Sequence, residues 1–264
     1  MMRFAVPNLV SAAVVFPLLT VLACGGGDGL EVAHVAGTRV GGASPGEFRA
    51  LVIVKTEGFR HGSIPDAIIA LEEIGEAIKL AVDTTEDTTV FDDAKLAGYR
   101  VVVFANTTGD LLLPNEEAAL ERFVRKGGGF VALHSATDTE HAWPFYGELV
   151  GARFVRHAEG VQTATIVVED PFHPSTAELP PRWQRTDEWY DFDRNPRPDV
   201  HVLLTVDEKT YSGGMMGADH PIAWTREIDQ GRAFVTALGH ASEAWRDEDL
   251  RAHVRGGILW AARR

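Results

Sequence analysis

The sequence predicts an α/β fold, with a mostly parallel β-sheet covered by helices on both faces and extra antiparallel strands in its second half. In the first half of the 264 residues, short β-branched runs alternate with amphipathic helical patterns. In the second half, strand-like runs follow one another with only loops between them. The composition, 45% hydrophobic and 24% charged, is that of an ordinary globular domain.

The first half contains three runs that are typical of buried strands, at residues 50–54 (ALVIV), 99–105 (YRVVVFA) and 129–133 (GFVAL). A helix is expected to begin at Ser63, because Ser-x-x-Asp resembles a capping box and an apolar stripe follows it. A second helix ends at the glycines that begin with Gly127. These glycines stop a helix and follow no strand, so they do not predict a phosphate-binding loop.

The second half contains four further strand-like runs, at residues 162–169, 201–208, 221–228 and 231–239. Loops rather than helices separate them, which predicts antiparallel strands beside the parallel sheet. Apolar residues spaced along 250–261 indicate a final helix.

The N-terminal segment has the features of a bacterial export signal. Residues 1–23 have a basic start and a long apolar stretch, and they end in VLA before Cys24, which resembles a lipobox. Cys24 is the only cysteine, so it cannot form an internal disulfide, and lipidation explains its position. Residues 24–47 are rich in glycine and alanine and predict a flexible tether to a domain over 48–264. The alternatives are a plain signal peptide or a membrane anchor helix.

This interpretation places the protein in the cell envelope or outside the cell, with a lipid as its only membrane attachment. The net charge of −13 argues against nucleic acid as a partner, because an acidic chain repels the phosphate backbone.

Polar residues follow four of the predicted strands at the point where each strand ends. In an open α/β sheet, ligands bind at the carboxyl ends of the strands, so these residues are expected to gather around one crevice. Three of them are histidines, although each histidine alone could equally be a hydrogen-bonded part of a loop. The residues are His61, Asn106, Thr107, His134, Ser135 and His240.

A second unusual stretch is TDEWYDFDRNPRP, at residues 186–198. Asp187 and Glu188 stand beside Trp189 and Tyr190, and carboxylates beside aromatic rings are typical of sugar sites. The alternative is a solvated turn whose aromatic side chains fill the core. Both interpretations remain open from the sequence.

Seven motifs in order make the chain resemble the ThuA-like (trehalose utilisation) family over residues 50–262. They are KTEGFRHGSIPDA, GGGFVALHSATDT, WPFYGELVGARF, RHAEGVQTATI, TDEWYDFDRNPR, GGMMGADHPIAWTRE and TALGHASEAW. The resemblance implies a flavodoxin-like, three-layer α/β/α fold like that of class I glutamine amidotransferases. It also implies a carbohydrate substrate, such as trehalose or a related, oxidised disaccharide.

Class I amidotransferases carry a catalytic cysteine at a strand end, and the matching position here is His134. With Cys24 in the signal segment, cysteine-dependent glutamine hydrolysis is excluded. One remaining mechanism is general acid–base catalysis by His134 with His61 or His240. In it, Glu188 or Asp187 would orient a histidine or bind hydroxyl groups.

A second mechanism uses a divalent metal such as zinc, with ligands among His61, His134, His157 and His240, although no HExxH spacing supports it. A third uses Ser135 as a nucleophile, and it is the weakest because LHSA is not a GxSxG elbow. The competing class is a surface-anchored sugar-binding or assembly domain without catalysis.

Overall fold

The computed structural model describes residues 48–264; Cys24, the expected signal peptide and the expected tether lie outside these residues. Within them, a nine-stranded sheet runs through the molecule, and a two-stranded sheet pairs β5 (Phe154–His157) with β8 (Tyr190–Phe192). In spatial order the large sheet contains β2 (Leu80–Thr85), β1 (Phe48–Ile53), β3 (Val101–Ala105), β4 (Gly129–Leu133), β11 (Gly231–Thr236), β10 (Pro221–Ile228), β9 (His201–Asp207), β6 (Gln162–Val168) and β7 (Arg182–Asp187).

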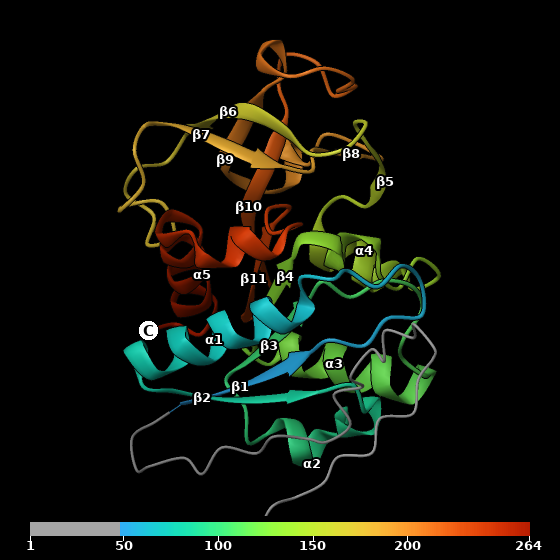
Figure 1. Cartoon of the computed structure of the whole chain (residues 1–264). Helices are drawn as coiled ribbons and strands as arrows, with labels where there is room; N and C mark the ends of the chain where they lie inside the picture. Colours follow the sequence, from blue (N-terminus) through green and yellow to red (C-terminus); the bar gives the residue numbers. More distant parts are fainter. Residues whose placement is uncertain (1–47) are drawn as a thin grey trace, which may run out of the picture. The chain divides into compact units, whose positions relative to one another are not determined.

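The pairing of strands in the large sheet changes from parallel to antiparallel at β11. From β2 to β11 all neighbouring strands are parallel, and from β11 to β7 all neighbours are antiparallel. Figure 1 shows β6, β7 and β9 beyond β10, far from the edge formed by β1 and β2. The predicted combination of a parallel sheet with antiparallel strands in the second half is therefore confirmed.

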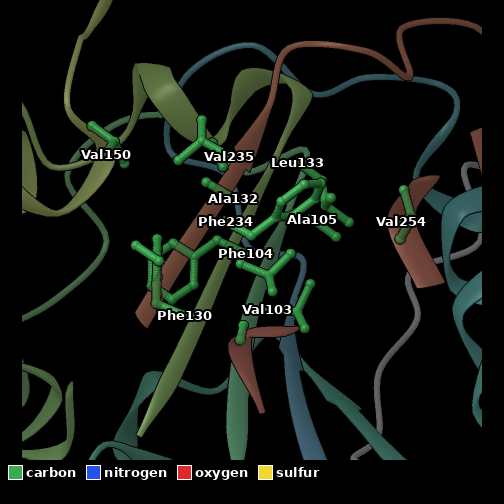
Figure 2. Close-up of a cluster of buried hydrophobic side chains, with 14 of the residues drawn as sticks. Val103, Phe104, Ala105, Phe130, Ala132, Leu133, Val150, Phe234, Val235 and Val254 are labelled. Carbon is green, nitrogen blue, oxygen red and sulfur yellow. The ribbon is translucent and has the colours of Figure 1, made fainter. Parts of the chain in front are cut away.

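Helices cover both faces of the parallel strands. On one face, Tyr146 of α4 (Pro144–Val150) packs against Phe104 and Phe130, with ring centroids 5.8 Å apart in both pairs. On the other face, His253 of α5 lies 5.1 Å from the ring of Phe234. Figure 2 shows Val150 of α4 and Val254 of α5 on opposite sides of the strands. The helices are α1 (Ile64–Ile78), α2 (Asp93–Leu96), α3 (Pro114–Arg125), α4 (Pro144–Val150) and α5 (Glu248–Ala261).

The core explains why the central strands have no polar alternation. All five residues of β3 are completely buried, because helices cover both of its faces. Burial of each large apolar side chain contributes about 1.5–3 kcal/mol, so a continuous apolar run is the favourable sequence for such a strand. Among residues 48–264, no helix is both long and apolar enough to cross a bilayer.

The start of α1 differs from the expected capping box. Ser63 is the N-cap residue, but its side chain makes no capping hydrogen bond. Instead, Ser63 Oγ accepts a hydrogen bond from Asn106 Nδ2 at 3.1 Å. Ser63 thus joins α1 to the loop after β3, and tertiary contact has taken the place of the local cap.

Four strands were not expected from the sequence. β7 alternates exposed and buried residues along its whole length, but its buried positions include Arg185 and Asp187, which hide the pattern. β2 carries the buried Asp83, which pairs with Arg49 of β1. β5 and β8 are only four and three residues long. Polar but paired residues and short length explain why the sequence pattern did not reveal them.

Candidate functional site

The site lies where the carboxyl ends of β1, β3, β4 and β11 meet. These strands are adjacent and parallel, so the segments that follow them share one edge of the sheet. His134 follows β4 directly, in a left-handed backbone conformation with φ of +51°. For a residue with a Cβ this conformation costs about 1–2 kcal/mol, and such strain is concentrated at functional sites.

The structure brings together three histidines and one carboxylate, which we call the His–Glu quartet: His61, His134, Glu188 and His240. The ring centroid of His134 lies 4.7 Å from that of His61 and 5.3 Å from that of His240. Glu188 Oε2 lies 3.1 Å from His240 Nδ1 and 3.8 Å from His134 Nε2. One potential ligand atom from each of the four residues lies within 4.8 Å of all the others.

Hydrogen bonds fix which nitrogen of His134 carries a proton. His134 Nδ1 lies 2.8 Å from the carbonyl oxygen of Ala237, which can only accept, so Nδ1 donates. In the neutral ring, Nε2 then presents a lone pair. Tyr190 Oη donates to that lone pair at 2.8 Å, and His61 Nε2 approaches it at 3.2 Å.

His61 and His240 also direct a ring nitrogen toward the centre of the quartet. The other nitrogen of His61, Nδ1, lies 3.2 Å from Ser135 Oγ. His240 Nδ1 is buried, and its nearest partner is Glu188 Oε2 at 3.1 Å, with which it forms an ion pair when protonated but no well-aligned hydrogen bond. A buried nitrogen that lacks a well-aligned hydrogen bond and faces other donors is typical of a site made for a ligand.

Burial sets the protonation of the quartet. Burial and the neighbouring His134 and His240 lower the pKa of His61 to about 3. Burial also lowers the pKa of His134 to about 4, despite the opposing charge of Asp187.

The interaction between Glu188 and His240 shifts the pKa of each group in the direction that favours its charged form. The Glu188 carboxylate raises the pKa of His240. Burial would raise the pKa of Glu188, but the interaction with His240 holds it below its ordinary value. Neutral His61 and His134 and an ionised Glu188 are the protonation states that metal ligands require, whereas His240 has to lose the proton that Glu188 stabilises.

A cavity of about 270 Å³ opens onto the quartet. His134 lies behind its wall and is completely buried. The cavity mixes acidic, imidazole and hydroxyl groups with aromatic rings. Its lining residues are Phe59, His61, Thr108, Ser135, Asp138, Phe154, His157, Glu188, Tyr190 and His240.

Four residues that the sequence suggested for substrate binding do not line this cavity: Asn106, Thr107, Trp189 and Asp187. Asn106 is buried and donates to Ser63 Oγ and to the carbonyl oxygen of Gly239. Thr107 Oγ1 shares a hydrogen bond of 2.8 Å with Thr139. Trp189 is 1% exposed, and its Nε1 donates to the Gln162 carbonyl oxygen at 2.8 Å. These side chains hold the surrounding loops together.

Asp187 does not line the cavity but stabilises the loop that carries His240. Its carboxylate accepts hydrogen bonds from the backbone N–H groups of Gly239 and His240, each at 3.0 Å, and pairs with Arg185 at 3.0 Å. These contacts fix the loop that carries His240. His157 lines the cavity and lies 3.3 Å from Glu188 Oε1, but it is not one of the four converging residues.

Four cavity residues are not among the site residues expected from the sequence: Phe59, Thr108, Asp138 and Phe154. Phe59 and Asp138 lie in the loops that carry His61 and His134, so their positions along the chain could have drawn attention to them. Phe154 reaches the cavity because β5 pairs with β8, which places it 4.3 Å from the ring of Tyr190. No local sequence pattern reveals that pairing.

The fold and the site together define an α/β protein with a histidine–carboxylate centre at the carboxyl edge of its parallel strands. A family model for ThuA, described as trehalose utilisation, matches residues 49–261, and the chain belongs to this family. Family membership supports a carbohydrate-related role. No curated protein matches the chain.

Solved structures of ThuA-like proteins share this fold. A ThuA-like protein from Bacteroides uniformis is 22% identical with a TM-score of 0.70, and the match covers 84% of this chain and 94% of that one. One from Parabacteroides merdae is 23% identical with a TM-score of 0.67, covering 82% and 90%. A β-galactosidase from Bacillus circulans is 12% identical with a TM-score of 0.54, covering 82% of this chain and 30% of the enzyme. At these identities the likeness concerns the fold alone.

Proposed function

We propose that this protein is a carbohydrate-active enzyme whose His–Glu quartet holds a divalent cation of the zinc class beside a sugar-binding cavity. The observation that carries the proposal is the convergence of four donor atoms within 4.8 Å of one another. Three imidazole nitrogens and a carboxylate oxygen are a donor set that zinc prefers.

The spacing of the donors fits such an ion. Ligands about 2.0–2.1 Å from a tetrahedral metal lie roughly 3.3 Å from one another. The two observed contacts between His61 and His134, at 3.2 Å, and between Glu188 and His240, at 3.1 Å, are close to that spacing. His134 also donates the N–H of its other ring nitrogen, Nδ1, to a backbone carbonyl, as metal-bound histidines commonly do.

A cation at this position would supply Lewis-acid activation and lower the pKa of bound water if a coordination position beyond the four protein ligands stays open, as in five-coordinate zinc. The chain's own residues then provide binding and proton transfer. Asp138 and His157 line the cavity beside the quartet, where they can hold hydroxyl groups or exchange protons with a sugar. Ser135 Oγ contacts His61 Nδ1, so its role here is to orient that ring.

Metal-free acid–base catalysis is the second candidate. The hydrogen bond from Tyr190 Oη to His134 Nε2 favours it, because it occupies the same lone pair that a metal would use. A sugar-binding domain without catalysis is the remaining alternative.

Metal content separates these possibilities. The protein is purified without chelators, incubated with Zn²⁺, Mn²⁺ or Co²⁺, desalted, and measured by inductively coupled plasma mass spectrometry. We expect about one equivalent in the wild type and almost none in His61→Ala or His240→Ala. His157→Ala is the matched control, a cavity histidine outside the quartet, and is expected to retain the metal.

Turnover is then measured on disaccharides in ordinary and oxidised form. Turnover that follows metal content across the variants supports the proposal. Metal-free wild type that remains active and loses activity in His134→Ala would favour acid–base catalysis. Sugar binding without turnover by the metal-loaded protein would favour the binding domain.

A further inference from the structure

We propose that Phe59 is a binding platform at the mouth of the cavity, and that it receives the apolar face of a second ring of the substrate. Phe59 is then the residue that selects a disaccharide, or another glycoside with a ring-shaped second unit, over the free monosaccharide. This inference rests on the proposed function, because it assumes that the cavity binds a sugar.

Phe59 is unusual because it lines the cavity and yet is 68% exposed. An exposed phenylalanine gains little from folding, and exposed apolar groups at a cavity often mark a ligand surface. In residues 48–264 the other strongly exposed phenylalanine is Phe172, at 90%, and it does not line this cavity.

The backbone of Phe59 is held firmly despite the exposure of its side chain. Its carbonyl oxygen accepts a hydrogen bond from Thr108 Oγ1 at 2.8 Å. The backbone N–H groups of Glu57 and Gly58 both donate to the carbonyl oxygen of Thr108, at 2.9 and 3.3 Å. The loop after β1 is therefore anchored to the loop after β3, and the ring is available without the entropic cost of ordering a flexible loop.

Phe59 also has a fixed relation to the quartet. Its ring meets the ring of His61 edge-on, with centroids 4.8 Å apart and an interplanar angle of 81°. A sugar ring bound at His61 and Glu188 would thus place its outward substituent near Phe59.

The size of the cavity indicates what that substituent must be. Its volume of about 270 Å³ lies at the lower end of ligand sites, which are roughly 300–1,000 Å³. One hexose ring suits such a space, and a second ring has to remain at the mouth. Phenylalanine offers no hydrogen-bonding group, so it recognises a C–H face rather than hydroxyl groups.

The test compares disaccharides with the corresponding monosaccharides, each in ordinary and oxidised form, on metal-loaded protein. In Phe59→Ala we expect KM, or Kd where there is no turnover, to rise about tenfold or more for the disaccharide, since burial against a phenylalanine is lost. The value for the monosaccharide and the kcat for the disaccharide are expected to change less than about twofold. Phe59→Trp is expected to retain disaccharide affinity, and Phe172→Ala is the matched control with no change.

Two results would overturn the inference. An equal loss for monosaccharide and disaccharide would mean that Phe59 shapes the inner cavity, and unchanged values for both would mean that it binds nothing. A melting temperature equal to that of the wild type shows that Phe59→Ala is folded. If the wild type neither binds nor converts any sugar in the panel, the proposed function itself fails, and this inference fails with it.

Discussion

The Nε2 atoms of His61 and His134 face each other at 3.2 Å, although the two residues are 73 positions apart in the chain. The Nδ1 of each ring is already engaged, with Ser135 Oγ for His61 and the Ala237 carbonyl oxygen for His134. His134 therefore directs the electron pair of Nε2 toward this point, and His61 does the same in the tautomer whose Nδ1 donates to Ser135 Oγ. Something positive, either a proton or a cation, stabilises that arrangement.

Replacing Tyr190 by phenylalanine distinguishes these two possibilities. The phenol donates to His134 Nε2 at 2.8 Å, so it competes with a metal for that lone pair. If the quartet binds a cation, Tyr190→Phe should increase zinc affinity by about threefold to tenfold, because a net hydrogen bond contributes roughly 0.5–1.5 kcal/mol. Competition against a fluorescent chelator measures this. A decrease in zinc affinity would contradict the prediction.

Asp187 is expected to act as a positioning residue for His240. Its buried carboxylate pairs with Arg185 and accepts the N–H groups of Gly239 and His240. In Asp187→Asn one oxygen can still accept, but Arg185 loses its buried carboxylate partner and keeps only Asp247, which is 40% exposed and lies 3.2 Å from Nη1. We expect a loss of roughly 2–3 kcal/mol in the free energy of unfolding, measured with urea, together with weaker zinc binding.

An exposed ion pair gives the control for Asp187. Asp93 pairs with Arg122 at 2.9 Å, and both side chains are about half exposed. Asp93→Asn should leave both stability and zinc binding unchanged, since exposed pairs contribute little. A full metal complement with wild-type affinity in Asp187→Asn would contradict the positioning role, whatever happens to stability.

The sequence predicts the parallel strands and their loops well because those strands are continuous apolar runs. Residues 99–105 and 129–133 include all of β3 and β4, and the polar residues after them lie at the site edge. The stretch at residues 186–198, which begins at the end of β7, has no such continuous apolar run. Asp187 and Trp189 point into the protein interior, while Glu188 and Tyr190 line the cavity.

This alternation is what extended backbone dictates, since successive side chains point to opposite sides. Trp189 therefore fills the interior, as the second interpretation expects, although residues 187–192 are buried and do not form a solvated turn. Glu188 and Tyr190 line the cavity, and a sugar site there stays a prediction. The contacts of Asp187 could not be predicted, because its partner Arg185 and the loop at Gly239 come together only on folding. Phe154 likewise reaches the site only through the pairing of β5 with β8.

The strained backbone at His134 predicts a difference between two variants that both remove the ring. His134 has φ of +51°, which an alanine tolerates poorly and a glycine adopts freely. His134→Gly should therefore be more stable than His134→Ala by about 1 kcal/mol, although glycine normally destabilises a folded chain. Urea unfolding of the two variants measures the difference. A less stable glycine variant would mean that the backbone at this position is not strained.

Glu140 predicts a pH dependence of stability away from the quartet. Its carboxyl group is 1% exposed and accepts hydrogen bonds from the N–H groups of Leu111 and Leu112. Burial raises its pKa from 4.5 to about 7, against the effect of these two hydrogen bonds. A carboxyl group with a raised pKa binds its proton more tightly in the folded state. Its contribution to stability is therefore complete below pH 4.5 and is lost as pH rises through 7.

Glu140→Gln should remove this loss, because the amide oxygen can still accept from both N–H groups and carries no charge. Relative to the wild type, the variant is expected to gain on the order of 2 kcal/mol in unfolding free energy between pH 5 and pH 8. Urea unfolding at both pH values measures the gain. Glu243→Gln, at an exposed position, is the control and should show none. A wild-type protein whose stability relative to Glu140→Gln is the same at both pH values would show that Glu140 stays ionised in the fold.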